Sequence, residues 1–134
     1  MKKYVFDSYA IIAFFADEKG ANIVEKALDE CLKGQAQGWM TVINWGEVFY
    51  ATAKVKREKL AQQIIQSLEH YPLTVVEADK TLTWEAACLK AKYPIAYADC
   101  FALALAKQKE AYLLTGDPEF EKVKENIRII WLNG

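Results

Sequence analysis

Four acidic residues of this sequence stand at positions where carboxylates could perform chemistry together. They are Asp7, Glu47, Asp99 and Asp117. Carboxylates that crowd within a few ångströms repel one another and raise each other's pKa values unless a cation neutralises them. Oxygen ligands favour a hard divalent ion, Mg²⁺ or Mn²⁺, that keeps part of its hydration shell for water and a substrate phosphate. Such a site would carry out metal-assisted hydrolysis of a phosphodiester.

Each acid also has an explanation that needs no chemistry. Asp7 and Asp117 could each cap a helix. Asn44 and Glu47 have the spacing of a capping box, and Asp99 could complement the positive end of a helix. Helix caps need not lie near one another, whereas acids at the carboxyl ends of parallel strands share one edge of a sheet. The order of strands and helices therefore decides between the two interpretations.

Apolar runs rich in branched and aromatic residues alternate with helical segments along the chain. We expect strands at residues 2–6, 38–43, 73–78, 111–115 and 127–132. We expect helices at residues 8–16, 21–33, 44–56, 58–69, 80–92, 97–110 and 118–124. Short apolar strands separated by helices predict right-handed crossovers and an α/β fold, a Rossmann-like three-layer sandwich with a five-stranded, mainly parallel sheet.

This topology predicts where the acids meet. Asp7, Glu47 and Asp117 follow three of the strands, so they belong to the same edge of the sheet. Asp99 lies in the first turn of its helix and joins them if that helix starts beside the same edge. The sequence therefore favours a metal site over four separate caps.

Length and composition limit the class of protein. The 134 residues fit one domain, residues 1–134. The longest uninterrupted apolar run, residues 9–16, is far shorter than the roughly 20 residues that cross a bilayer, so we expect a cytoplasmic protein without membrane contact. Three cysteines without CxxC spacing suit a reducing compartment and are predicted to fill the core. A single histidine, His70, leaves little for multi-histidine mechanisms.

Charge does not favour binding to a polyanion through a basic surface. The net charge is −1, and phosphate neutralisation by Lys and Arg normally supplies such affinity. The densest basic run, residues 54–59, is predicted to be a solvated helix face. A phosphodiester held by metal ions needs no basic surface, so an RNA substrate stays compatible with this charge.

Several motifs resemble the PIN-domain ribonucleases, most closely the VapC-type toxins of toxin–antitoxin pairs. These motifs are VFDSYAIIAFF, NWGEVFYA, YADCFALALAKQKEAYLLTGDPEF and IRII. The third is the most specific, because Asp99 precedes an Ala-rich helix and an 18-residue step leads to a T-G-D-P turn. The resemblance runs from Val5 to Trp131, nearly the whole chain.

The resemblance implies a function and a set of roles. The PIN family binds Mg²⁺ or Mn²⁺ through four acids and cleaves single-stranded RNA, and these roles carry over to the four acids named above. It implies that Ser8, Asn44 and Thr115 orient the acids. It also implies a homodimer and an antitoxin whose tail covers the active site. Beside the site, Trp45 is predicted to lie in the core or a dimer interface, and Cys100 to be a packing residue.

Two other functions stay open at this point. A PIN module could bind RNA or protein without turnover, although the usual sign of that role would be missing acids. An aspartyl-phosphate receiver or phosphotransferase would use Asp7 as the phosphate acceptor. The sequence offers no second Asp two residues after Asp7 and no Lys closing a late strand, so the receiver has less support.

Overall fold

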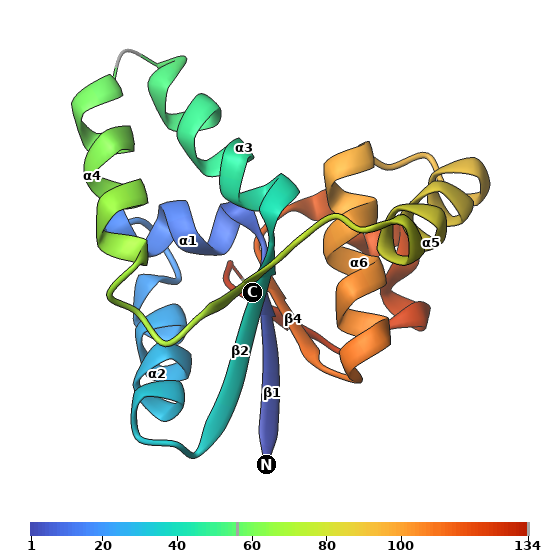
Figure 1. The fold of residues 1–134 in the computed structure, drawn as a ribbon, viewed down its shortest axis with the longest axis horizontal. Helices are drawn as coiled ribbons and strands as arrows, with labels where there is room; N and C mark the ends of the chain where they lie inside the picture. Colours follow the sequence, from blue (N-terminus) through green and yellow to red (C-terminus); the bar gives the residue numbers. More distant parts are fainter. Residues whose placement is uncertain (56, 134) are drawn as a thin grey trace.

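The computed structural model describes residues 1–55 and 57–133, which form a sheet with helices on both faces (Figure 1). The strands are β1 (Lys2–Phe6), β2 (Ala36–Thr41), β3 (Thr74–Val76), β4 (Tyr112–Thr115) and β5 (Ile129–Trp131). The helices are α1 (Ser8–Phe15), α2 (Ala21–Leu32), α3 (Val42–Ala53), α4 (Glu58–Leu68), α5 (Lys80–Lys92), α6 (Tyr97–Lys109) and the 3₁₀ helix η1 (Pro118–Asn126). Within the described residues, no helix combines the length and the apolar character that crossing a membrane requires.

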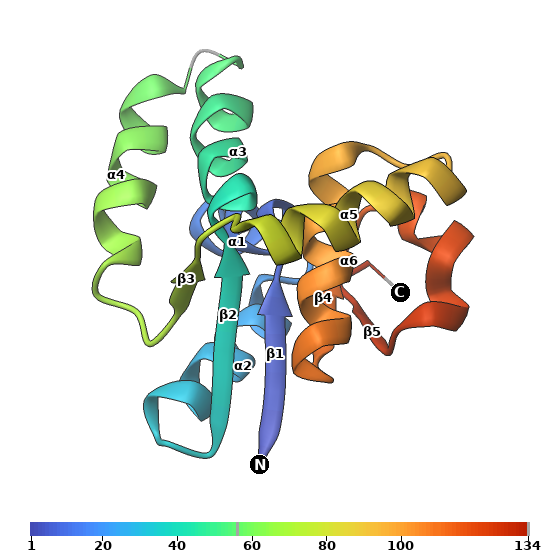
Figure 2. The same cartoon turned by 45° about the vertical axis from the view of Figure 1, so that its right-hand side comes forward.

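β1 lies at the centre of the sheet, whose strand order is β3-β2-β1-β4-β5. Every neighbouring pair is parallel, so the predicted α/β sandwich is confirmed. The register pairs Val5 with Trp39 and Phe6 with Leu114. The segments that follow β1, β2 and β4 therefore emerge at one edge, and Figure 2 shows α3 rising from the tip of β2 beside the tip of β1.

The side chains of β1 alternate between the two faces of the sheet. Tyr4 and Phe6 join an apolar cluster with α1, α2 and α4, whereas Val5 joins a second cluster with α5, α6 and η1. β4 divides in the same way, with Leu114 in the first cluster and Leu113 in the second. Both faces of the sheet are thus covered, as in other parallel sheets, and burial of this apolar surface is the main driving force for folding.

α6 is buried along most of its length. All residues from Asp99 to Ala106 are buried, and the run is rich in alanine. Small side chains allow the helix to lie close to its neighbours, and α6 packs against α3, α5, β1 and β2. The Ala-rich pattern of this segment thus reflects tight packing on several sides.

The junction of β2 and α3 differs from the prediction. We expected the strand to run to residue 43 and Asn44 to open the helix, but α3 begins at Val42 and Thr41 is its N-cap. The Thr41 hydroxyl accepts a hydrogen bond from the backbone amide of Asn44 (3.0 Å). Branched Val42 and Ile43 favour a strand, yet the cap bond fixes them in the first helical turn.

Predictions for single side chains met mixed outcomes. Cys31 and Cys100 are buried, but the prediction was wrong for Cys88, which is exposed. On α5 the buried positions are Leu82 and Ala86, and Cys88 lies on another face of the helix. Trp45 is partly buried and packs against the first apolar cluster, the one that contains Tyr4 and Phe6, which confirms the core interpretation.

The basic run lies at the turn between α3 and α4, not along one helix face. Lys54, Arg57 and Lys59 are exposed there. Lys56 falls outside the described residues. The solvated character of the run is thus confirmed for these three residues, while the prediction of a helix face was wrong for Lys54 and Arg57, which flank the two helices as C-cap and N-cap.

Gly20 is the N-cap residue of α2 and lies against Leu132, directly after β5. Its φ is 91°, and a Cβ added there would lie 2.6 Å from the Leu132 carbonyl oxygen. We expect Gly20→Ala to lower the free energy of unfolding by about 2–4 kcal/mol, because a left-handed backbone and an overpacked contact add. Urea denaturation measures the loss. Gly34→Ala is the control, since its φ is 75° but no atom lies within 4 Å of the added Cβ; equal losses would contradict the role of Leu132.

Candidate active site

Asp7 stands directly after β1. Its side chain caps α1 by accepting a hydrogen bond from the Ala10 amide (Oδ1 to N, 2.9 Å). Only 2% of the residue is exposed, and its own amide donates to the Leu114 carbonyl (3.4 Å). The cap bond engages one carboxylate oxygen, so capping does not exclude a second role for the other.

Glu47 is half-buried on α3 and is held by two polar neighbours. The Ser8 hydroxyl donates a hydrogen bond to Glu47 Oε1 (2.8 Å), and the side-chain amide of Asn44 donates one to the same oxygen (Nδ2 to Oε1, 3.3 Å). Asn44 is fully buried, donates also to the Ala98 carbonyl (3.3 Å) and accepts from the Thr41 hydroxyl (2.6 Å). These bonds join the first turns of α1, α3 and α6.

Thr41 is a member of this polar group that the sequence reasoning missed. It is fully buried and bonds to Asn44 through both its hydroxyl oxygen and its hydroxyl proton. The predicted strand runs through residue 43, so it does not reveal that Thr41 stands at the start of a helix. A Thr at the end of an apolar run, with a polar residue three positions later, is an N-cap pattern that could have revealed it.

Asp99 lies in the first turn of α6 and is 6% exposed. The sequence could place it at this edge only if α6 started there. The bond between Asn44 and the Ala98 carbonyl establishes that it does, since it fixes the start of α6 against the first turn of α3. Cys100 is fully buried, which confirms its packing role.

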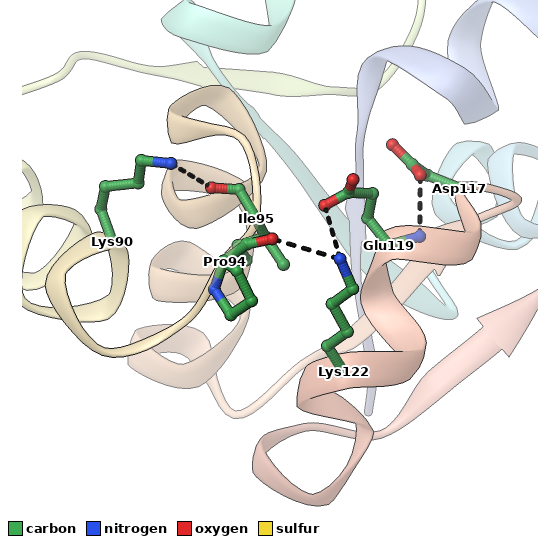
Figure 3. A network of polar contacts seen from close by, with 6 residues as sticks. All are labelled: Lys90, Pro94, Ile95, Asp117, Glu119 and Lys122. Carbon is green, nitrogen blue, oxygen red and sulfur yellow. Dashed lines mark hydrogen bonds and ion pairs between the residues drawn. The ribbon is translucent and has the colours of Figure 1, made fainter.

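The segment before α6 is fixed by two lysines (Figure 3). Lys90 donates to the Ile95 carbonyl (2.8 Å), and Lys122 donates to the Pro94 carbonyl (3.3 Å). Because Lys122 belongs to η1, its bond ties the start of α6 to the element that Asp117 caps. These contacts limit how far the two elements can separate.

Asp117 follows β4 and is half-buried. It caps η1 by accepting from the Glu119 amide (2.9 Å), and its own amide donates to the Thr115 hydroxyl (3.0 Å). Figure 3 shows the second carboxylate oxygen of Asp117 pointing away from the Glu119 amide. The cap interpretation of Asp117 is therefore confirmed, and an oxygen is left for another ligand.

The four carboxylates form one electrostatic group. Burial raises the pKa of Asp7 to about 7, and the charges of Asp117 and Glu47 contribute to the rise. A hydrogen bond from Thr115 lowers the pKa of Asp7 and only partly offsets that rise. Burial also raises the pKa of Asp99 to about 8, together with the charges of the three other acids. The structure therefore brings the four predicted acids within electrostatic reach of one another.

The donor set fits a divalent cation. Four carboxylates offer only oxygen, the ligand that Mg²⁺ and Mn²⁺ prefer. Burial, with a contribution from the neighbouring carboxylates, raises the pKa values of Asp7 and Asp99, and a bound cation would favour their charged forms. In residues 1–55 and 57–133, no three acidic, histidine or cysteine side chains already enclose a position for an ion. Coordination by three or more of the acids would therefore require side chains to turn.

Comparison with known proteins agrees with this architecture. A family model described as the PIN domain matches residues 4–126. The chain belongs to the PIN-domain family. No curated protein sequence gives a significant match.

Solved structures share the fold of this PIN domain at low sequence identity. VapBC2 from Rickettsia felis, bound to a DNA fragment from its promoter, gives a TM-score of 0.73 at 16% identity and covers 96% of this chain and 97% of the matched chain. DNA-bound VapBC from Salmonella typhimurium gives a TM-score of 0.73 at 17% identity and covers 97% of this chain and 98% of the matched chain. VapC20 from Mycobacterium tuberculosis, a toxin that cleaves the sarcin–ricin loop, gives a TM-score of 0.69 at 11% identity and covers 91% of this chain and 95% of the matched chain. This PIN domain thus has the fold of the VapC toxins.

The raised pKa values predict how stability depends on pH in the presence of a chelator. Asp7 and Asp99 ionise at an ordinary pKa of 3.8 when unfolded, but at about 7 and about 8 in the native structure. Between these values the native state holds more protons than the unfolded state, so the free energy of unfolding falls as pH rises from about 4 to about 8. Each of the two groups contributes at most about 1.4 kcal/mol per pH unit to this fall.

Urea denaturation at several pH values measures this slope. Asp7→Asn should flatten it, because the amide does not titrate. Asp79→Asn should leave it unchanged, because Asp79 caps α5 (Oδ1 to the Leu82 amide, 2.8 Å) and is not among the acids whose charges raise these two pKa values. Stability that rises with pH over this range would contradict the charge crowding.

Proposed function

We propose that this PIN domain is a metal-dependent endoribonuclease that hydrolyses phosphodiesters of single-stranded or structured RNA. The observation that carries the proposal is the convergence of four carboxylates from the β1–α1 junction, α3, α6 and the β4–η1 junction. Helix capping accounts for Asp7 and Asp117 one at a time, but it does not account for four charges gathered from separate elements. The residues assigned to metal binding and catalysis are Asp7, Glu47, Asp99 and Asp117.

Mg²⁺ or Mn²⁺ is the cofactor that these oxygens would hold. When bound, such an ion supplies an acidic water nucleophile and neutralises charge on the phosphate. The supporting residues act on the carboxylates. Ser8 and Asn44 both donate to one oxygen of Glu47, which fixes the direction of the other oxygen. The Thr115 hydroxyl donates a hydrogen bond to Asp7 and accepts one from the backbone amide of Asp117, so it orients two acids at once.

The biological role we propose is that of a toxin controlled by an antitoxin. Three observations support it: the PIN-domain membership, the fold shared with VapBC pairs, and the fold shared with a VapC toxin that cleaves the sarcin–ricin loop. A protein partner would then cover the acids until it is lost, and the active protein would be a homodimer. Co-expression with the gene immediately upstream, followed by co-purification, tests the partner.

The central prediction concerns two acids. Asp7→Asn and Asp99→Asn should each lower cleavage of RNA in magnesium by more than about 100-fold, a larger loss than is usual for outer-shell partners of metal sites. Both should stay folded, since Asn caps helices as well as Asp and removes a buried charge. Gel analysis of RNA fragments gives the activity, and circular dichroism gives the fold.

Asp79→Asn is the matched control for Asp7→Asn. It removes the charge of another N-cap with nearly the same bond length, and it should cleave RNA at the parental rate. Parental cleavage by both Asp7→Asn and Asp99→Asn would overturn the site assignment.

Metal binding should also appear as stability. Mg²⁺ or Mn²⁺ should raise the melting temperature, because an ion that binds only the folded site adds about 2.7 kcal/mol at 100 times its Kd. The rise should shrink in Asp117→Asn, which loses a charge and keeps a capping side chain. Differential scanning calorimetry measures both, with KCl of equal ionic strength as the control. An equal rise in KCl would assign the effect to screening.

A further inference from the structure

Most aromatic side chains of this protein are at least partly buried, but a few are exposed. In residues 1–55 and 57–133 the exposed aromatic residues are Tyr9, Phe49, Tyr50, Trp84 and Tyr97. An exposed aromatic ring is a surface on which a flat ligand can stack. The position of each ring relative to the four acids therefore has functional meaning.

Tyr50 lies beside Glu47 on α3. Residues three apart on a helix share one face, so the ring follows Glu47 by one turn, farther from the sheet. The side chain is 51% exposed. The pKa of its phenol is raised by partial burial and by the charges of Glu47 and Asp99, which places the ring near both acids.

Tyr9 lies at the start of α1, beside the turn of a different acid, Asp117. Its ring rests against the backbone of Gly116, because a Cβ added at Gly116 would overlap three ring atoms. Gly116 stands between Thr115 and Asp117, so the ring covers the turn that carries Asp117. It remains 39% exposed. A side chain at residue 116 would displace the ring, so a glycine at this position allows Tyr9 to lie against the turn.

The other exposed rings are less well placed. Residues two apart on a helix do not face each other, so Phe49 points away from Glu47 and Tyr97 from Asp99. Tyr9 is also two residues from an acid, Asp7, but its contact with Gly116 places it beside Asp117. Tyr97 also packs against Phe101 (centroids 5.0 Å apart). Trp84 lines a groove with Ala104 and Lys107 in the second half of α6, away from the first turn that holds Asp99.

We propose that Tyr9 and Tyr50 stack on unpaired RNA bases on the two sides of the phosphodiester that is cut. The proposal rests on the proposed nuclease function and adds how the substrate is held. The chain has a net charge of −1 and gathers four acids at this edge, so apart from a bound metal ion, attraction of phosphates to the protein surface contributes little affinity. Stacking on aromatic rings is uncharged and accepts any base, and it requires bases that are not enclosed in a duplex.

The test measures binding of a short, unstructured oligoadenylate in the Asp99→Asn background, where RNA is not consumed. Tyr9→Leu and Tyr50→Leu should each weaken binding by about tenfold, within the range measured for base–aromatic stacking. Tyr9→Phe and Tyr50→Phe keep the ring and should bind like the parent. Trp84→Leu removes an exposed ring away from the acids and should also bind like the parent.

An abasic oligomer of the same length and charge separates stacking from other roles. It should bind weakly to the parent, and Tyr50→Leu should cause no further loss, because the interaction is already absent. The dependence of binding on salt should stay the same in the Leu variants, since no phosphate contact is removed. A structural role of the tyrosine would lower binding of both oligomers equally, and that result would overturn the proposal.

Three further outcomes separate this proposal from the function on which it rests and from a contact between copies of the chain. If the parent cleaves RNA in magnesium but the Leu variants bind oligoadenylate unchanged, the stacking proposal is wrong and the nuclease stands. If the parent neither binds nor cleaves RNA, both fail. If the Leu variants change the oligomeric state in size-exclusion chromatography and lose binding for that reason, the rings belong to a contact between copies and the stacking proposal is overturned.

Discussion

Parallel hydrogen bonding of β1 to β2 on one side and to β4 on the other places Asp7 level with the ends of both neighbours. The same register sends Tyr4 and Phe6 to one face and Val5 to the other. A slip of one residue would reverse these faces and expose the apolar set. The position of the first acid is thus fixed by the packing of the core, and the remaining elements arrange the other acids around it.

The gathered carboxylates oppose folding when no cation is present. Burial and mutual charge both raise the pKa of Asp7 and Asp99, and perturbed values of this kind are typical of functional sites. Two apolar clusters cover the faces of the sheet and offset this penalty. Hydrogen bonds from Ser8 and Asn44 to Glu47 further hold one acid in place without adding a positive charge.

Sequence patterns predicted the sheet and most helices because short runs rich in apolar residues alternate with longer helical segments. They placed Asp7 and Asp117 at one edge by topology, since both follow central strands. They could not place Asp99, because its helix does not follow a strand directly; that position depends on contacts such as the bond from Asn44 to the Ala98 carbonyl.

The errors have local causes. Val42 and Ile43 are branched residues that favour strands, but the Thr41 cap places them in a helix. Cys88 was assigned to the core from its residue type alone, although Leu82 and Ala86 are the buried positions of its helix. Tyr9 and Tyr50 carry no pattern that distinguishes them from core aromatics, so their exposure beside the acids emerges only in three dimensions.

The exposed Cys88 gives this chain a built-in attachment point. Cys31 and Cys100 are buried, so a maleimide dye would react with α5 while the other two thiols stay protected. The attached dye would sit beside a groove of about 380 Å³ that both Cys88 and Trp84 line, close enough for the indole to quench or shift its emission. A fluorescent reporter remote from the acids is thus available without any change to the sequence.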